Sequence, residues 1–173
     1  LVAGSAVEMP WAEQAKAIVW GWYGGMEAGH AFADVLFGDV NPSGKLPLTV
    51  ARSVGQLRMI YNHKPSAYFH KYADEKKTPL YPFGYGLSYT NYKYSKPLLS
   101  NTSLNKEDKI IVTTEITNTG EVDGEEIAQL YIRDNVSSVT RPVKELKGYQ
   151  RVFLKAGETK KIKFTINSES LAF

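Results

Sequence analysis

Carboxylates and histidines are the side chains here that could do acid–base chemistry. The most suggestive carboxylate is Glu27, which falls just inside the start of a predicted helix. Free N–H groups and the helix dipole stabilise a negative charge there by about 0.3–1 kcal/mol, and this structural role is the favoured interpretation. A catalytic role for Glu27 is the alternative. Asp34 lies on the polar side of the same helix, where solvent exposure or a structural hydrogen bond accounts for it.

Metal and thiol chemistry find no support in the sequence. The chain has no cysteine, so thiolate nucleophiles, disulfides and Cys-based metal sites are excluded. His30, His63 and His70 are too scattered to form a metal triad, and neither a His-x-x-x-His spacing nor a paired carboxylate accompanies them. We therefore predict no metal site and no cofactor. His63 and His70 are interpreted as surface loop residues, with the lining of a ligand site as the alternative.

Aromatic side chains gather in residues 53–95, which lack any regular hydrophobic period. Tyr68, Phe69 and Tyr72 are flanked by charges. We predict them as accessory ligand-binding residues, with structural packing as the alternative. A second group of aromatic residues lies in 81–89, where a proline and two glycines are interspersed among them. Amphipathic rings suit a seam between domains, where one end is dry and the phenol stays wet. We predict a packing role for this second group.

Residues 1–52 show an α/β pattern. The apolar run at residues 17–20 suits a strand covered on both faces. One apolar helix face then follows, with Gly38 where a helix stop is expected: Ala28, Ala31, Phe32, Val35 and Leu36. A turn at residues 39–44 leads into an extended segment at 46–50. These strands are too few for a complete sheet, and we expect their partners upstream.

Residues 96–173 read as consecutive strands. Residues 110–117 alternate with a period of two, and further strands are predicted at 128–132, 143–154 and 162–166. Short strands at about ten-residue spacing predict an immunoglobulin-like β-sandwich. The absence of a cysteine pair favours the fibronectin III-like type. A last edge strand is expected beyond residue 173.

The predicted organisation is therefore an α/β fragment at 1–52, an inter-domain linker at 53–95 and a β-sandwich at 96–173. The net charge of +3 is spread over mixed acidic and basic residues, without the basic stripe of a nucleic-acid interface. No apolar run approaches the about 20 residues of a membrane helix. We predict neither nucleic acid nor membrane as a partner, and the sequence leaves the cellular compartment open.

Three groups of motifs follow one another along the chain. The first is residues 24–47, GGMEAGHAFADVLFGDVNPSGKLP, and the second is residues 79–90, PLYPFGYGLSYT. The third comprises residues 117–120 (TNTG), 129–132 (QLYI) and 140–149 (TRPVKELKGY). In this order they resemble the α/β sandwich domain, the inter-domain segment and the fibronectin III-like domain of glycoside hydrolase family 3.

The resemblance implies a larger, β-glucosidase-like parent enzyme. Such enzymes carry an N-terminal (β/α)8-type barrel before the α/β sandwich, and hydrolyse β-linked glucosides, xylosides or related oligosaccharides with retention. Retention needs two carboxyl groups about 5–5.5 Å apart, and no cofactor. The resemblance places the nucleophilic Asp on the barrel and the acid/base Glu on a loop before residues 7–11. No catalytic residue is therefore assigned, and this fragment alone is expected to be inactive.

Two other interpretations stay open. The chain could be a free-standing carbohydrate-binding or adhesion module, although such a module has no use for an incomplete sheet. It could also be one half of a split enzyme, whose first 52 residues bind a partner carrying the barrel and the remaining half of the sandwich domain. Unpaired apolar strands would then be an association liability.

Overall fold

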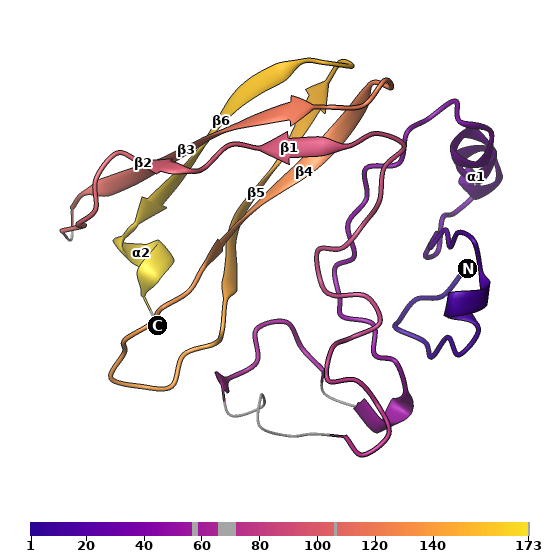
Figure 1. Ribbon diagram of the computed structural model, residues 1–173, viewed down its shortest axis with the longest axis horizontal. Coiled ribbons are helices and arrows are strands. Elements are labelled where there is room, and N and C mark those ends of the chain that lie inside the picture. Colours follow the sequence, from indigo (N-terminus) through magenta and orange to yellow (C-terminus); the bar gives the residue numbers. More distant parts are fainter. Residues whose placement is uncertain (57–58, 66–71, 106, 173) are drawn as a thin grey trace. The chain divides into compact units, whose positions relative to one another are not determined.

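The computed structural model describes residues 1–56, 59–65, 72–105 and 107–172 (Figure 1). The chain forms two compact units, and each borrows a segment that lies inside the other in sequence. Unit 1 consists of Leu1–Val40, Gly44–Gly86 and Ile132–Glu145. Unit 2 consists of Asn41–Ser43, Leu87–Tyr131 and Leu146–Phe173. The boundaries expected from the sequence, at residues 53 and 96, stay predictions.

The helix expected in unit 1 is confirmed as α1, Ala28–Phe37. It ends at Gly38, whose φ of 87° lies in the left-handed region and whose N–H donates to the Val35 carbonyl over 3.2 Å. Glycine adopts this φ without the steric cost that a Cβ imposes. Two short 3-10 turns, Ala12–Gln14 and Val54–Gln56, complete the described helical segments of this unit.

The strand predicted at residues 17–20 is wrong, because this segment has no regular secondary structure. Leu1 lies beside it: the Leu1 amino group donates to the Val19 carbonyl, and the Leu1 carbonyl accepts from the Gly21 N–H. An apolar run becomes a strand only when neighbouring strands supply a ladder of hydrogen bonds. Residues 46–50, predicted to be extended, bend at residues 47–48 and form one bridge, between Val50 and Tyr81.

A small apolar core holds unit 1 together. Met9, Ala12 and Val50 are buried at its centre. Partly buried side chains from four stretches of the chain pack around them: Val7, Ile18, Trp20, Leu46, Leu48, Leu80 and Tyr81. By contrast, the neighbourhood of α1 is open, with exposed fractions of 99% for Met26, 85% for Phe37 and 66% for Leu36.

Unit 2 contains the predicted β-sandwich. In one sheet β3 (Lys109–Asn118) lies between β6 (Thr159–Asn167) on one side and β1 (Tyr92–Tyr94) with β2 (Leu98–Leu99) on the other, all antiparallel (Figure 1). The second sheet pairs β4 (Gly124–Ile132) with β5 (Glu145–Leu154). A short helix, α2 (Ser168–Leu171), follows β6 and is capped by Asn167.

The core of the sandwich is built by alternate residues of both sheets, as the period of two predicts. Its buried members come from β3, β4, β5 and β6: Val112, Ile116, Ala128, Leu154, Ile162 and Phe164. Burying one such large apolar side chain stabilises the fold by about 1.5–3 kcal/mol. The sheet-on-sheet core therefore confirms the sandwich.

Asn118, at the end of β3, is fully buried and joins four segments of unit 2. Its side-chain oxygen accepts from Thr90 Oγ1 at 2.5 Å and from the Gly120 N–H at 3.1 Å. Its amide nitrogen donates to the carbonyls of Val122 at 2.8 Å and Leu154 at 3.3 Å. A buried amide is stable only when its bonds are made, and here both ends are satisfied.

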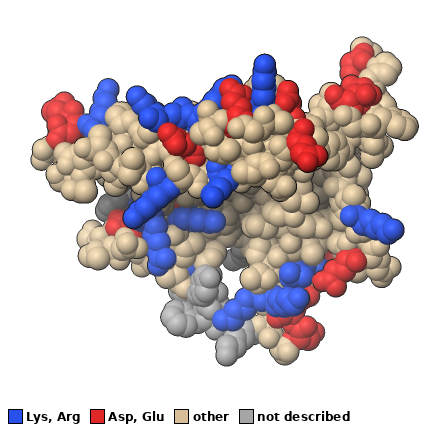
Figure 2. All heavy atoms as spheres, turned by 45° about the horizontal axis from the view of Figure 1, so that its top comes forward, with Lys and Arg blue, Asp and Glu red and all other residues tan. Residues whose placement is uncertain are grey.

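Charged side chains of both signs are interspersed on the face that Figure 2 shows. Several form ion pairs in unit 2, such as Arg151 of β5 with Glu125 of β4 at 3.1 Å, and Lys160 with nearby Glu158 at 3.3 Å. Exposed pairs of this kind contribute little to stability. None of the helices in the described ranges has the length and apolarity needed to cross a membrane.

Candidate functional site

The residues predicted for ligand contact are only partly visible. Tyr68 and Phe69 lie outside the described residues. Tyr72 is described and is 38% exposed. The accessory role of these three residues stays a prediction.

Glu27 is placed as the N-cap of α1, and its carboxylate pairs with His30. Glu27 Oε2 and His30 Nδ1 are 2.8 Å apart, and both side chains are more than four-fifths exposed. The i,i+3 spacing of this pair was visible in the sequence, although the pairing was not predicted. Within the described ranges, no three His, Asp or Glu side chains gather closely enough to hold a metal ion.

The aromatic residues of the linker pack against each other within unit 1. The rings of Tyr61 and Phe83 stack with centroids 4.1 Å apart, and those of Tyr81 and Tyr85 stack at 5.3 Å. Such pairs contribute about 0.5–1.5 kcal/mol beyond their buried area. These contacts give Tyr81 and Tyr85 a structural role.

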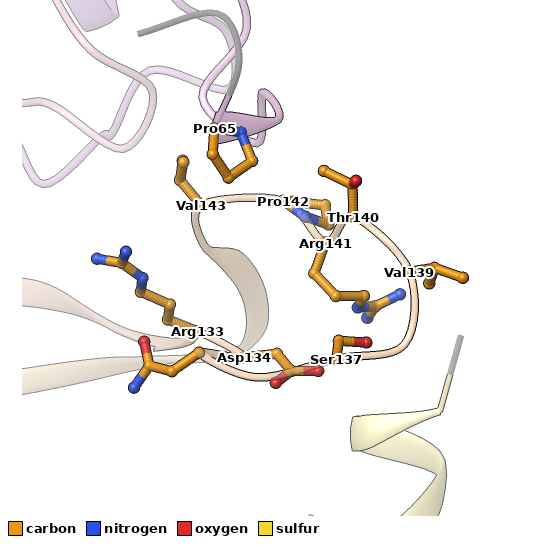
Figure 3. Close-up of a pocket in the computed structure, with 10 residues that line it drawn as sticks. Pro65, Arg133, Asp134, Ser137, Val139, Thr140, Arg141, Pro142 and Val143 are labelled. Atoms are coloured by element: carbon orange, nitrogen blue, oxygen red, sulfur yellow. The ribbon is translucent and has the colours of Figure 1, made fainter.

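A small cavity lies within unit 1, where the loop between β4 and β5 meets Pro65 (Figure 3). We call it the loop cavity, and its volume is about 210 Å³. Its lining comes almost wholly from residues 133–143: Arg133, Asp134, Asn135, Ser137, Val139, Thr140, Arg141, Pro142 and Val143. The Val143 N–H donates to the His63 carbonyl over 2.9 Å, which fixes the loop beside Pro65.

Two further interactions hold the walls of the loop cavity. Arg141 Nη2 donates to Glu145 Oε2 at 2.8 Å, and the Arg141 side chain is only 14% exposed. Asp134 Oδ1 accepts from the Val136 N–H at 3.1 Å. In Figure 3 the Arg141 guanidinium and the Asp134 carboxylate both extend toward Ser137. The Ser137 hydroxyl is buried and has no hydrogen-bond partner in the described part of the chain.

Sequence reasoning missed the loop cavity. Residues 140–149 were noticed as a family-like string, but no periodic or compositional signal marks residues 133–139 as a wall. The cavity depends on Pro65 approaching a loop some seventy residues later, which is a tertiary contact. Its one local sign is the mixture of Arg, Asp, Asn, Ser and Thr in a single loop.

The shifted pKa values belong to unit 2, whereas the loop cavity belongs to unit 1. Burial raises the pKa of Tyr92 and Tyr94 above the ordinary value for tyrosine, and the nearby Glu126 carboxylate raises both further. The pKa of the Glu158 carboxyl is lowered, chiefly because the Lys155 N–H donates to it over 2.8 Å.

Comparison with known families assigns both parts of the chain. Residues 1–89 match the Glycosyl hydrolase family 3 C-terminal domain. Residues 126–173 match the Fibronectin type III-like domain. These are the two domain types that the sequence motifs resemble, in the same order.

Curated relatives support the same assignment. A periplasmic β-glucosidase of Salmonella typhimurium is 46% identical over 171 residues, covering 93% of this chain and 22% of the relative. A β-xylosidase of Formosa agariphila is 47% identical over 163 residues, covering 92% and 22%. The chain thus spans about a fifth of the length of the curated relatives it matches.

Solved structures agree with the sequence matches. A β-glucosidase from Erythrobacter marinus superposes with a TM-score of 0.90 at 46% identity, covering 92% of this chain and 21% of that one. A β-glucosidase from Listeria innocua in complex with isofagomine gives a TM-score of 0.83 at 37% identity, with 92% and 24% covered. This chain belongs to glycoside hydrolase family 3.

Proposed function

We propose that this chain is the C-terminal part of a retaining β-glycosidase, β-glucosidase-like, that hydrolyses O-glycosidic bonds of β-linked glucosides or xylosides. The support is the family membership together with the names of the relatives, which are β-glucosidases and a β-xylosidase. Structures of the Listeria innocua relative hold glucose and laminaribiose, which are β-glucosidase ligands. Two carboxyl groups suffice for the reaction, so no cofactor is required.

Within that protein, we propose that the chain frames the active-site cleft and braces the catalytic domains. The observation that carries the bracing role is the exchange of segments between the two units. Ile132–Glu145, which joins strands β4 and β5 of the sandwich, belongs to unit 1. Asn41–Ser43, which interrupts unit 1 in sequence, belongs to unit 2. The backbone therefore passes between the units several times, so separating them disturbs both.

Asn41 shows how tightly one exchanged segment is held inside unit 2. Its side-chain nitrogen donates to the Asp123 carbonyl at 2.9 Å. Its side-chain oxygen accepts from Ser88 Oγ and from the Tyr89 N–H, each at 2.8 Å. One side chain thus fixes three points of the sandwich unit.

The open surface around α1 supports docking onto a longer polypeptide. Met26, Leu36 and Phe37 present large apolar areas to solvent, and clustered exposed apolar side chains mark interaction surfaces. We propose that residues 1–52 pack against the rest of the sandwich domain in the full-length protein. Because residues 1–89 belong to an enzyme family, a free-standing carbohydrate-binding module is the weaker alternative.

The catalytic proposal is tested on the full-length protein that contains these residues. Aryl β-glucoside and aryl β-xyloside are supplied as substrates, and proton NMR follows the first sugar released. We expect turnover of at least one substrate with the β-anomer appearing first, as retention requires. Failure to cleave either substrate, or release of the α-anomer first, contradicts the proposal.

The bracing role is tested in the same protein with Asn41→Ala. Loss of three hydrogen bonds, two of them to backbone groups, is expected to cost about 1–3 kcal/mol and to lower the melting temperature. Activity is expected to be lost at a correspondingly lower temperature. The matched control is Asn91→Ala, an exposed asparagine whose side chain makes no hydrogen bond to the described residues. Equal melting temperatures and equal activities of the two variants would contradict the proposed bracing role.

A further inference from the structure

We propose that the loop cavity is a binding site for a neutral, hydroxyl-rich ligand of the size of one sugar ring. Nothing in the proposed hydrolytic function requires such a site, and the inference rests on the walls of the cavity alone. It lies entirely within unit 1, between Pro65 and residues 133–143.

The volume limits the ligand to something small. Pockets for drug-sized ligands occupy about 300–1,000 Å³. The loop cavity, at about 210 Å³, is smaller than this range. A single pyranose or a comparable cyclic polyol suits such a space better than a disaccharide or a nucleotide.

The polar part of the wall mixes hydrogen-bond donors and acceptors. Arg133 offers donors, Asp134 offers acceptors, and Asn135 and Thr140 offer both. Each hydroxyl of a sugar both donates and accepts, so this mixture is complementary to a polyol. The apolar part of the wall can contact the C–H face of a ring, and it consists of Pro65, Val139, Pro142 and Val143.

The charges of the wall favour a neutral ligand over an anion. Arg141 is neutralised by its ion pair with Glu145 at 2.8 Å. The charge of Arg133 is opposed by Asp134 in the same wall. The wall therefore has no excess of positive charge to attract an anion, and its carboxylate would repel one. A neutral polyol is not affected by this absence of net charge.

The cavity is held open and its wall has unused hydrogen-bonding capacity. The Val143–His63 hydrogen bond and the Arg141–Glu145 pair fix two sides of the loop. The Ser137 hydroxyl, buried without a partner among the described residues, lies where the Arg141 and Asp134 side chains converge (Figure 3). An unsatisfied buried hydroxyl is unusual. Because this oxygen is closed to solvent, the polar contacts open to a ligand come from the other side chains of the wall.

The test uses the full-length protein with isofagomine added in saturating amount, so that glucose cannot enter a β-glucosidase active site. Calorimetric titration with glucose is expected to show saturable binding, and titration with inorganic phosphate under the same conditions is not. If isofagomine itself fails to bind, the proposed glycosidase function is in doubt, and glucose binding is then assigned to the loop cavity only by the wall variants described next.

Variants locate the binding. Thr140→Val keeps the shape of the side chain and removes its hydroxyl, and Asn135→Ala removes an amide from the wall; both residues are exposed, so the fold should be kept. Each is expected to weaken glucose binding at least tenfold, and Asn101→Ala, in unit 2, to leave it unchanged. Unchanged affinity in both wall variants overturns the proposal. So does tighter binding of phosphate than of glucose, or no saturable binding of glucose.

Discussion

At the scale of single residues, Asn118 carries more of the fold than its side-chain size suggests. Its amide satisfies the Thr90 hydroxyl, the Leu154 carbonyl, and the Gly120 N–H and Val122 carbonyl of the turn that follows β3. Removing the Asn118 side chain leaves these partners without their hydrogen bonds. A buried polar group left unsatisfied in this way costs about 1–3 kcal/mol.

We therefore expect Asn118→Ala to lower the free energy of unfolding by about 2–3 kcal/mol. Urea denaturation of this chain measures the change. Asn101→Ala is the matched control, because Asn101 is exposed and its side chain bonds only to the next two residues. Its effect should stay within about 0.5 kcal/mol. Similar losses in the two variants would show that the buried network contributes nothing special.

The sequence revealed some of these residue roles and hid others. Gly38 was predictable as a helix stop, because the need for a left-handed φ is a local property of the backbone. Two of the four partners of Asn118 were not, because Thr90 and Leu154 lie far away in the chain. The loop cavity was missed for the same reason. Features set by neighbouring residues in the sequence could be predicted. Features set by contacts between residues far apart in the sequence could not.

At the scale of elements, α1 offers two glycines in opposite situations. A Cβ added at Gly38 or at Gly29 meets no described atom within 4 Å, so steric crowding does not separate them. Gly38 has a φ of 87°, whereas Gly29 lies inside the helix. The difference between them is one of backbone conformation alone.

Gly38→Ala is expected to destabilise the chain by about 1 kcal/mol, because an L-residue resists a left-handed φ. Gly29→Ala should stabilise it by about 0.5–1 kcal/mol, because alanine loses less backbone entropy in a helix. Thermal unfolding followed by circular dichroism gives both values. Shifts of the same sign in the two variants would contradict this assignment of the helix end.

Elements were predicted well where their own pattern decides their structure. The alternation at residues 110–117 became β3, and the predicted strand or strands at 143–154 became the single strand β5. The run at 17–20 has an equally apolar composition, yet it formed no strand. A strand in the antiparallel sandwich finds its partners within the described unit, whereas the run at 17–20 has no strand beside it in the described residues to supply a ladder of hydrogen bonds.

At the scale of the whole molecule, the chain is about a fifth of the length of its relatives. We expect the isolated chain to release no measurable nitrophenol from an aryl β-glucoside. The reason is that retention needs two carboxyl groups about 5–5.5 Å apart, and the family resemblance places both before residue 7. Turnover by the isolated chain that Glu27→Gln abolishes would overturn this prediction and make Glu27 a catalytic residue.

The exchange of segments also sets an order for assembly during synthesis. Unit 1 begins at the first residue but includes Ile132–Glu145. Nascent domains usually fold as they leave the ribosome, the N-terminal one first. Here the earlier unit cannot finish until the strand before that segment, β4, has also emerged. A polypeptide released before residue 145 therefore leaves both units unfinished.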